Sequence, residues 1–240
     1  MDKFITAICC ASLLSVPVGG KEKITLAAVP ALSPDGAKLV FNWAGDLWTV
    51  DSMGGEARPL TRHPASDHWP EYSPDGKELV FQSQRNGYKQ LFIMPADGGD
   101  PTPVSWHTEG LTAQDWFPDG NHILATGWRD HSGLFAERLF KIKVRERVAE
   151  ELLFDAYARE ATVSPNGRQI LFVREGNSLY RKGYAGSKAA QIWLYNIDGK
   201  TFTLQQSKPA VAGPLCGVRT ERGSISWVPQ AGASISGNVK

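Results

Sequence analysis

Four of the five histidines are the side chains whose type and placement first suggest chemistry in this chain of 240 residues. Imidazole nitrogens gathered at one level of a fold could bind zinc, which prefers tetrahedral nitrogen and sulfur ligands. The spacing of these histidines matches none of the closed zinc-ligand patterns, and polar residues are common in surface loops. The sequence therefore predicts no metal site and no cofactor. The four histidines in loop-like segments are His63, His68, His107 and His131.

The sequence lacks the common catalytic motifs. It contains no Gly-x-Ser-x-Gly elbow, no His-Glu-x-x-His and no glycine-rich phosphate loop after a strand. The paired carboxylates Glu150 and Glu151 stand in a charged run, where solvation explains them. Because covalent hydrolysis needs an activated nucleophile beside a base, we expect this chain to hydrolyse no peptide, ester or phosphoester.

Short hairpins are the elements that would position any site. In the segment from Asp67 to Val104, the turn 73–76 has a proline that presets φ and a glycine, Gly76, that accepts positive φ. A strand over 77–83 follows, and Asn86-Gly87 is a strong hairpin dipeptide. Further strands are expected over 90–94 and 102–105. Four short antiparallel strands in one meander form one blade of a β-propeller.

The same turn recurs along the chain at intervals of about 40–50 residues, the period of propeller blades. Four turns in phase predict an all-β propeller with about four recognisable four-stranded antiparallel blades in an incomplete ring. Trp48 and Trp193 occupy equivalent strand positions and are assigned to packing between blades. The glycines that close the turns are Gly36, Gly76, Gly120 and Gly167, and the blades are expected at residues 24–60, 61–105, 106–154 and 155–206.

Residues 1–20 differ from the rest of the chain. Phe4 to Val18 is uncharged and mostly apolar, which is typical of a signal-peptide core and too short to span a bilayer. We expect cleavage after Gly20 and a protein exported to the periplasm or secreted. The alternatives are a buried first strand or a misassigned start, because Asp2 offsets Lys3 in the expected basic region. Cleavage would leave one cysteine, Cys216, and no disulfide within the chain.

Composition sets the limits on partners and the surface loops suggest where they bind. With 42% hydrophobic residues, 21% charged residues and a formal net charge of +1, the chain has an ordinary globular composition. This charge favours neither nucleic acid nor a membrane surface as partner.

A loop over 176–190 interrupts the fourth blade, and it either contacts a peptide or protein ligand or only covers a neighbouring blade. Its candidate contact residues are Tyr180, Arg181, Lys182 and Tyr184.

The last segment, 207–240, is rich in Gly, Ala, Ser and Pro and alternates poorly. It is predicted to be an irregular or disordered tail. Ser226-Trp227-Val228-Pro229 is similar to the phrase Trp116-Phe117-Pro118 that precedes an earlier turn, so a decayed fifth blade is the alternative.

Three short sequence motifs, at residues 73–77, 85–87 and 94–99, indicate a family. They resemble the propeller repeats of the tricorn protease family and of the Tol-system protein TolB. The stretches 45–64 and 181–193 are similar to parts of the first and fourth blades of tricorn-type propellers. The resemblance covers about residues 24–204. It implies a non-catalytic, six-bladed propeller that filters unfolded peptides for a large serine peptidase, while a TolB-type periplasmic interaction module remains the alternative.

The sequence differs from the tricorn-type propellers in its number of blades, which is six in that family. Four blades are legible, and the residues after 206 are fewer than one further blade of roughly 40 residues. We therefore expect a truncated relative, ended by a frameshift near Ser207, that lacks the C-terminal protease domains or self-associates through open blade edges. A third alternative, an enzyme with its site on the propeller face, would need clustered carboxylates that the sequence does not show.

Overall fold

The computed structural model describes residues 24–25, 27–128, 137–174, 190–206, 215–219 and 225–229. Every regular element in these ranges is a strand, so the predicted all-β class is confirmed. The first sheet contains β1 (Ala28–Leu32), β2 (Lys38–Trp43), β3 (Asp46–Asp51) and β4 (Arg58–Pro59). The second contains β5 (Asp67–Tyr72), β6 (Glu78–Ser83), β7 (Gln90–Pro95) and β8 (Thr102–Pro103).

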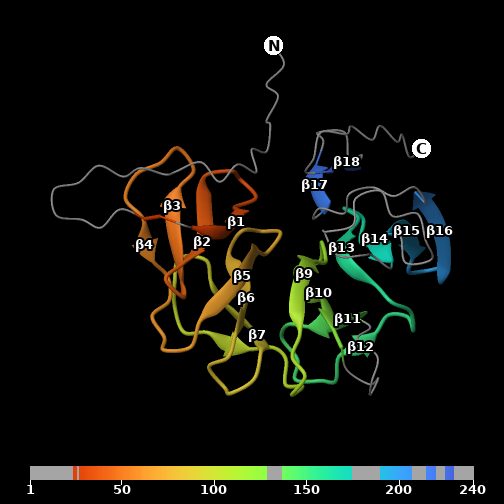
Figure 1. The fold of residues 1–240 in the computed structure, drawn as a ribbon, viewed down its shortest axis with the longest axis horizontal. Helices are drawn as coiled ribbons and strands as arrows, with labels where there is room; N and C mark the ends of the chain where they lie inside the picture. Colours follow the sequence, from red (N-terminus) through yellow and green to blue (C-terminus); the bar gives the residue numbers. More distant parts are fainter. Residues whose placement is uncertain are drawn as a thin grey trace, which may run out of the picture.

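Two further four-stranded sheets complete the blade series. The third contains β9 (Thr112–Trp116), β10 (His122–Gly127), β11 (Arg138–Lys143) and β12 (Glu151–Leu152). The fourth contains β13 (Arg159–Val163), β14 (Gln169–Arg174), β15 (Gln191–Asn196) and β16 (Thr201–Gln206). All pairings are antiparallel between consecutive strands, as in propeller blades. Figure 1 shows the four sheets side by side in an arc, with β1, β5, β9 and β13 on its inner side.

A hydrogen-bonded network explains why the turn phrase recurs. In the second blade the Ser73 hydroxyl donates to Asp75 (2.8 Å) and accepts from the backbone N–H of Glu78 (2.9 Å). The Gly76 N–H donates to the Ser73 carbonyl at 2.8 Å. The same contacts recur around Ser33 and around Ser164, where Asn166 replaces the aspartate. Each turn thus satisfies its own polar groups, which is why this short phrase specifies a hairpin.

The glycine of the turn has two roles. Gly76 has φ of 72°, a region that favours glycine, and a Cβ there would lie 3.3 Å from Cδ of Pro34 in the preceding blade's turn. Gly167 stands in the same relation to Pro118, at 3.6 Å. The turns of the first and second blades, and those of the third and fourth, therefore lie against each other.

Gly76→Val is expected to lower the free energy of unfolding by at least ~1 kcal/mol, because it adds backbone strain and crowds Pro34. Gly36→Val is the matched control, since Gly36 has φ of 73° and no atom within 4 Å of its would-be Cβ. Thermal denaturation of both variants separates strain from crowding. An unchanged melting temperature for Gly76→Val would contradict the role assigned to this turn.

Hydrophobic clusters lie between successive blades. The first two blades share one that includes Val40, Phe81 and Phe92, and the rings of Phe81 and Phe92 stack at 5.9 Å. Two further clusters join the second blade to the third and the third to the fourth. Their large, fully buried members follow the period-two pattern of the strands.

Polar side chains join each blade to the inner strand of the next. The Asn42 amide on β2 donates to the carbonyl of Asp67 on β5. The Gln82 amide on β6 donates to the carbonyl of Leu111 (2.8 Å), just before β9. The Gln114 side chain on β9 accepts from the N–H of Ala161 on β13 at 3.2 Å. We call these contacts the inter-blade clamps.

A two-stranded antiparallel hairpin follows the fourth blade, formed by β17 (Leu215–Arg219) and β18 (Ile225–Pro229). It lies in the segment expected to be an irregular tail. β17 lies against β13, as β9 lies against β5, which is the arrangement that the fifth-blade alternative requires. The other residues of the segment, 207–214, 220–224 and 230–240, lie outside the described residues, as does the expected signal peptide.

Candidate functional site

The predicted contact loop is not part of the described structure. Tyr180, Arg181, Lys182 and Tyr184 lie within 175–189, between β14 and β15. The corresponding links in the four blades, between the second and third strands, are 44–45, 84–89, 128–137 and 175–190. Each is longer than the one before, so loop variation between blades is concentrated in this link.

The histidines occupy different settings. His63 and His107 each use Nδ1 to accept a hydrogen bond from a backbone N–H two residues later, at 3.0 and 3.2 Å. His68 is exposed on β5 and not in a loop, and His131 lies outside the described residues. Among the residues that the structure describes, no three His, Cys, Asp or Glu side chains are placed to hold a metal ion. Two of the four imidazoles thus order their own loops.

The inner strands carry irregular backbone that the sequence did not predict. In β1, β5 and β13 the pairing with the second strand shifts register, and Val29, Trp69 and Glu160 take φ of 49°, 56° and 47°. Positive φ is unusual for bulky residues, and bulges of this kind redirect side chains. Trp69, at the bulge of β5, is 51% exposed. The repeated bulge therefore shapes what the inner side of the arc presents.

Equivalent positions two residues before the turn hold Ala31, Glu71, Asp115 and Thr162 in the four blades. Asp115 accepts hydrogen bonds from its neighbour Trp116 N–H (2.8 Å), from Val163 N–H (2.8 Å) and from the Thr162 hydroxyl (2.7 Å). Burial raises the pKa of Asp115, and these three donors act against that rise. Asp115 is therefore a structural carboxylate that adds to the clamp between the third and fourth blades.

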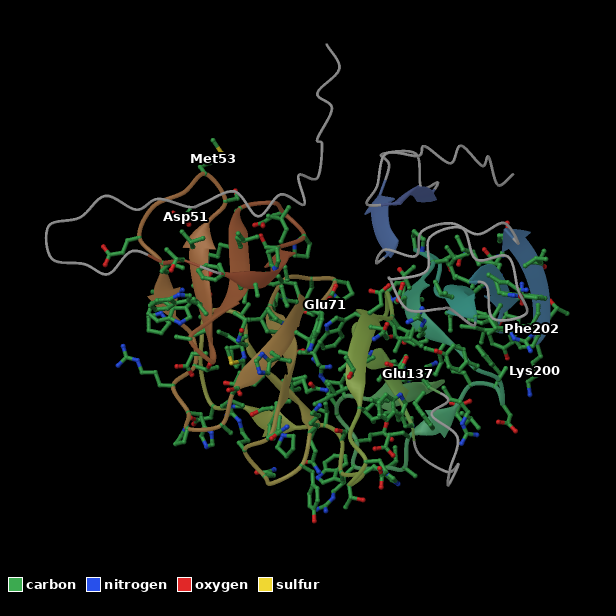
Figure 2. The ribbon with its side chains drawn as sticks, viewed as in Figure 1. Asp51, Met53, Glu71, Glu137, Lys200 and Phe202 are labelled. Atoms are coloured by element: carbon green, nitrogen blue, oxygen red, sulfur yellow. The ribbon has the colours of Figure 1, made fainter. Side chains whose placement is uncertain are left out.

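Glu71 has the same position but no such role. It has no hydrogen-bond or ion-pair partner among the described residues, and its side chain is exposed. Figure 2 shows Glu71 at the inner side of the arc, where β5 faces β9. Desolvation by the surrounding protein, followed by the charge of Asp115, raises the pKa of Glu71 to about 8. Its exposed side also meets water, which favours the ionised form.

The other charged side chains of the four inner strands have partners. Asp67 is fully buried and receives two hydrogen bonds of 2.9 Å from Arg85, whose guanidinium also lies over the rings of two buried phenylalanines. Arg159 and Glu160 pair with each other at 3.5 Å. On these four strands, Glu71 is the carboxylate that the fold does not use. The sequence signal for it was available, since Glu71 and Asp115 precede the same turn by the same interval.

The sequence model of the tricorn protease N-terminal beta propeller domain matches residues 25–213, which is most of the chain. The chain belongs to this family. The match begins just before β1 and ends beyond β16, so it includes all four blades of this tricorn-type propeller.

Two curated relatives connect the family to peptidases. The tricorn-type chain is 28% identical to an uncharacterised peptidase, YuxL, of Bacillus subtilis over 137 residues, covering 52% of this chain and 19% of that protein. It is 26% identical to tricorn protease homolog 1 of Streptomyces coelicolor over 191 residues, covering 75% of this chain and 17% of that protein. The chain thus spans about a fifth of the length of these relatives.

Solved structures show the same fold. The tricorn protease structure matches with a TM-score of 0.62 and 16% identity, covering 87% of this chain and 20% of that one. TolB from Acinetobacter baumannii matches with a TM-score of 0.60 and 18% identity, covering 77% and 44%. At these identities the likeness concerns the propeller fold alone. No helix in the described residues of this tricorn-type chain is long and apolar enough to cross a membrane.

Proposed function

We propose that this tricorn-type propeller binds extended polypeptides and does not cleave them. One observation carries the proposal: β1, β5, β9 and β13 lie next to one another, and within its sheet each pairs with one strand only. Contacts between blades use some backbone groups of the second edges, such as the Asp67 carbonyl and the Ala161 and Val163 N–H groups. The remaining N–H and C=O groups lie beside exposed side chains such as Trp69 and Glu71. An extended peptide can pair with such an edge while neighbouring side chains provide selectivity.

The relation to peptidases supports a role in substrate handling. In a longer tricorn-type protein, such a propeller would admit unfolded chains to a peptidase site outside these four blades. The sequence offers no nucleophile with a base in the motifs of known hydrolases. We therefore assign the chain peptide binding and gating, and we assign hydrolysis to other parts of the whole protein.

A TolB-type protein-interaction module is the second candidate. It is supported by the TM-score of 0.60 to the TolB structure, which is a likeness of fold. Such a module would bind folded envelope proteins, whereas a gating propeller would prefer unfolded chains.

A binding assay separates the two candidates. The purified chain is expected to raise the fluorescence anisotropy of a labelled, unstructured 15-residue peptide and to leave a labelled folded protein unaffected. Mass spectrometry of the same mixtures is expected to show intact peptide. Capture of folded envelope proteins without peptide binding would favour the TolB-type module. Hydrolysis that disappears on substitution of one Ser or His of this chain would overturn the non-enzymatic assignment.

We also propose that residues 1–20 direct export and are then removed. The apolar, uncharged run from Phe4 to Val18 supports this. N-terminal sequencing of the protein from an envelope fraction is expected to begin near Lys21, and an intact Met1 on that protein would contradict the proposal.

A further inference from the structure

We propose that Glu71 and Trp69 on β5 recognise a positively charged group of a bound peptide. That group is a lysine or arginine side chain, or a free N-terminal amine. The inference rests on the proposed peptide binding and adds to it a chemical preference, since nothing in a gating propeller requires selection by charge.

The first step is that the fold does not need Glu71. At the equivalent position of the next blade, Asp115 receives three hydrogen bonds, two of which join two blades, whereas Glu71 receives none from the described residues. The N–H that Glu71 could have bound by analogy belongs to Trp116, and Asp115 of the same strand already accepts from it. Glu71 is therefore left as an exposed carboxylate on the inner side of the arc.

The second step is that no cation of the described protein balances this carboxylate. Arg159, on one of the four inner strands, pairs with Glu160, and Arg85 binds Asp67 of β5 with two hydrogen bonds. The closest charge that acts on Glu71 is another carboxylate, Asp115, and both effects on its pKa oppose ionisation. A bound ammonium or guanidinium group would reverse this balance and favour the ionised form.

The third step is the exposed indole two residues away. Trp69 is 51% exposed on the same strand, although large apolar side chains are usually buried, and its backbone has φ of 56°. Indole faces attract ammonium and guanidinium groups, more strongly than other aromatic rings do. An exposed indole and an unpaired carboxylate on one strand edge are the two kinds of group that bind an organic cation.

The test uses four labelled peptides of one Gly/Ser sequence, three of them capped at the N-terminus, bound to the full chain at about pH 8.5, above the raised pKa of Glu71. They carry a central Lys-Arg, Gln-Gln or Glu-Glu pair, or a free N-terminal amine without the pair. The Lys-Arg peptide is expected to bind about fivefold more tightly than the Gln-Gln peptide, as one ion pair and one cation–π contact at a partly exposed site allow. The free-amine peptide is also measured near pH 7, because an α-amino group has a pKa of about 7.7–8.0 and is mostly uncharged at pH 8.5.

Three variants locate the preference. Glu71→Gln is expected to remove most of the preference for the Lys-Arg peptide, leaving the part that the Trp69 ring contributes, while the affinity of the Gln-Gln peptide stays unchanged. Trp69→Asn, which tolerates positive φ, is expected to reduce the preference in part. Asp51→Asn is the matched control, because it removes one exposed negative charge at the end of β3, away from the inner strands (Figure 2), and is expected to keep the preference.

The outcomes separate the two proposals. Equal binding of all peptides to the parent chain would overturn the charge-recognition site and leave the proposed function standing. A preference for Lys-Arg that is undiminished in Glu71→Gln would also overturn the site. Failure of every peptide to bind would overturn both proposals. Circular dichroism of each variant checks folding, and Glu71→Gln is expected to melt no lower than the parent because Glu71 has no partner to lose.

Discussion

Arg85→Ala is expected to lower the free energy of unfolding by about 3–5 kcal/mol, the usual effect of leaving a buried charge without its partner. The Asp67 carboxylate is fully buried, and both of its oxygens accept hydrogen bonds of 2.9 Å from Arg85. The same guanidinium lies 5.3 and 5.1 Å from the ring centroids of Phe81 and Phe92. Alanine would remove the ion pair and this packing together, and urea denaturation measures the loss.

Arg58→Ala is the control for this prediction. Arg58 also pairs with an aspartate, Asp97, at 3.6 Å, but both side chains are more than half exposed. An exposed pair contributes about 0–1 kcal/mol, so the variant is expected to unfold almost like the parent. Equal losses for the two arginine variants would show that the buried pair has no special weight.

Asp115→Ala is expected to cost about 3 kcal/mol, since hydrogen bonds to a charged group contribute about 1.5–3 kcal/mol each and two backbone donors would lose their acceptor. Those donors are the N–H groups of Trp116 and Val163, and the second belongs to the next blade. We expect the fourth blade to open first. Hydrogen exchange is expected to show the largest gain around Val163.

Thr162→Val tests the same site more gently. It removes the hydroxyl that donates to Asp115 at 2.7 Å and keeps both backbone donors, so a loss of about 1 kcal/mol is expected. If Asp115→Ala were no more damaging than Thr162→Val, the clamp through the Val163 backbone would be refuted. Removing the Asp115 charge is also expected to lower the pKa of Glu71, because that charge is one of the two causes that raise it.

Much of the fold followed from local chemistry in the sequence. The turn at Ser73 closes with its own hydroxyl, carboxylate and glycine, so a phrase of four residues was enough to predict it. The strands between such turns are short and rich in β-branched, aromatic and other apolar residues, and the turns that separate them indicated four strands in each blade. These features depend on contacts within a few residues.

The candidate site could not be predicted from the sequence because it depends on contacts between blades, whose residues are far apart in the chain. The roles of Glu71 and Asp115 differ only because a neighbouring blade supplies donors to one and not to the other. The bulge at Trp69 has no turn residue to signal it, since a tryptophan takes the positive φ. The hairpin of β17 and β18 was not predicted, because apolar and polar residues alternate only weakly in this Gly- and Ser-rich segment.

The inter-blade clamps all point in one direction along the chain. Asn42 of the first blade reaches the second, Gln82 of the second reaches the third, and Gln114 of the third reaches the fourth. During synthesis on the ribosome, each blade can therefore form its hairpins first. Its polar side chain can then form a hydrogen bond with the inner strand of the blade that is synthesised next. If the blades assemble in the order of translation, the apolar face of each blade is exposed only until the next blade, roughly 40 residues long, has left the ribosome and packs on it.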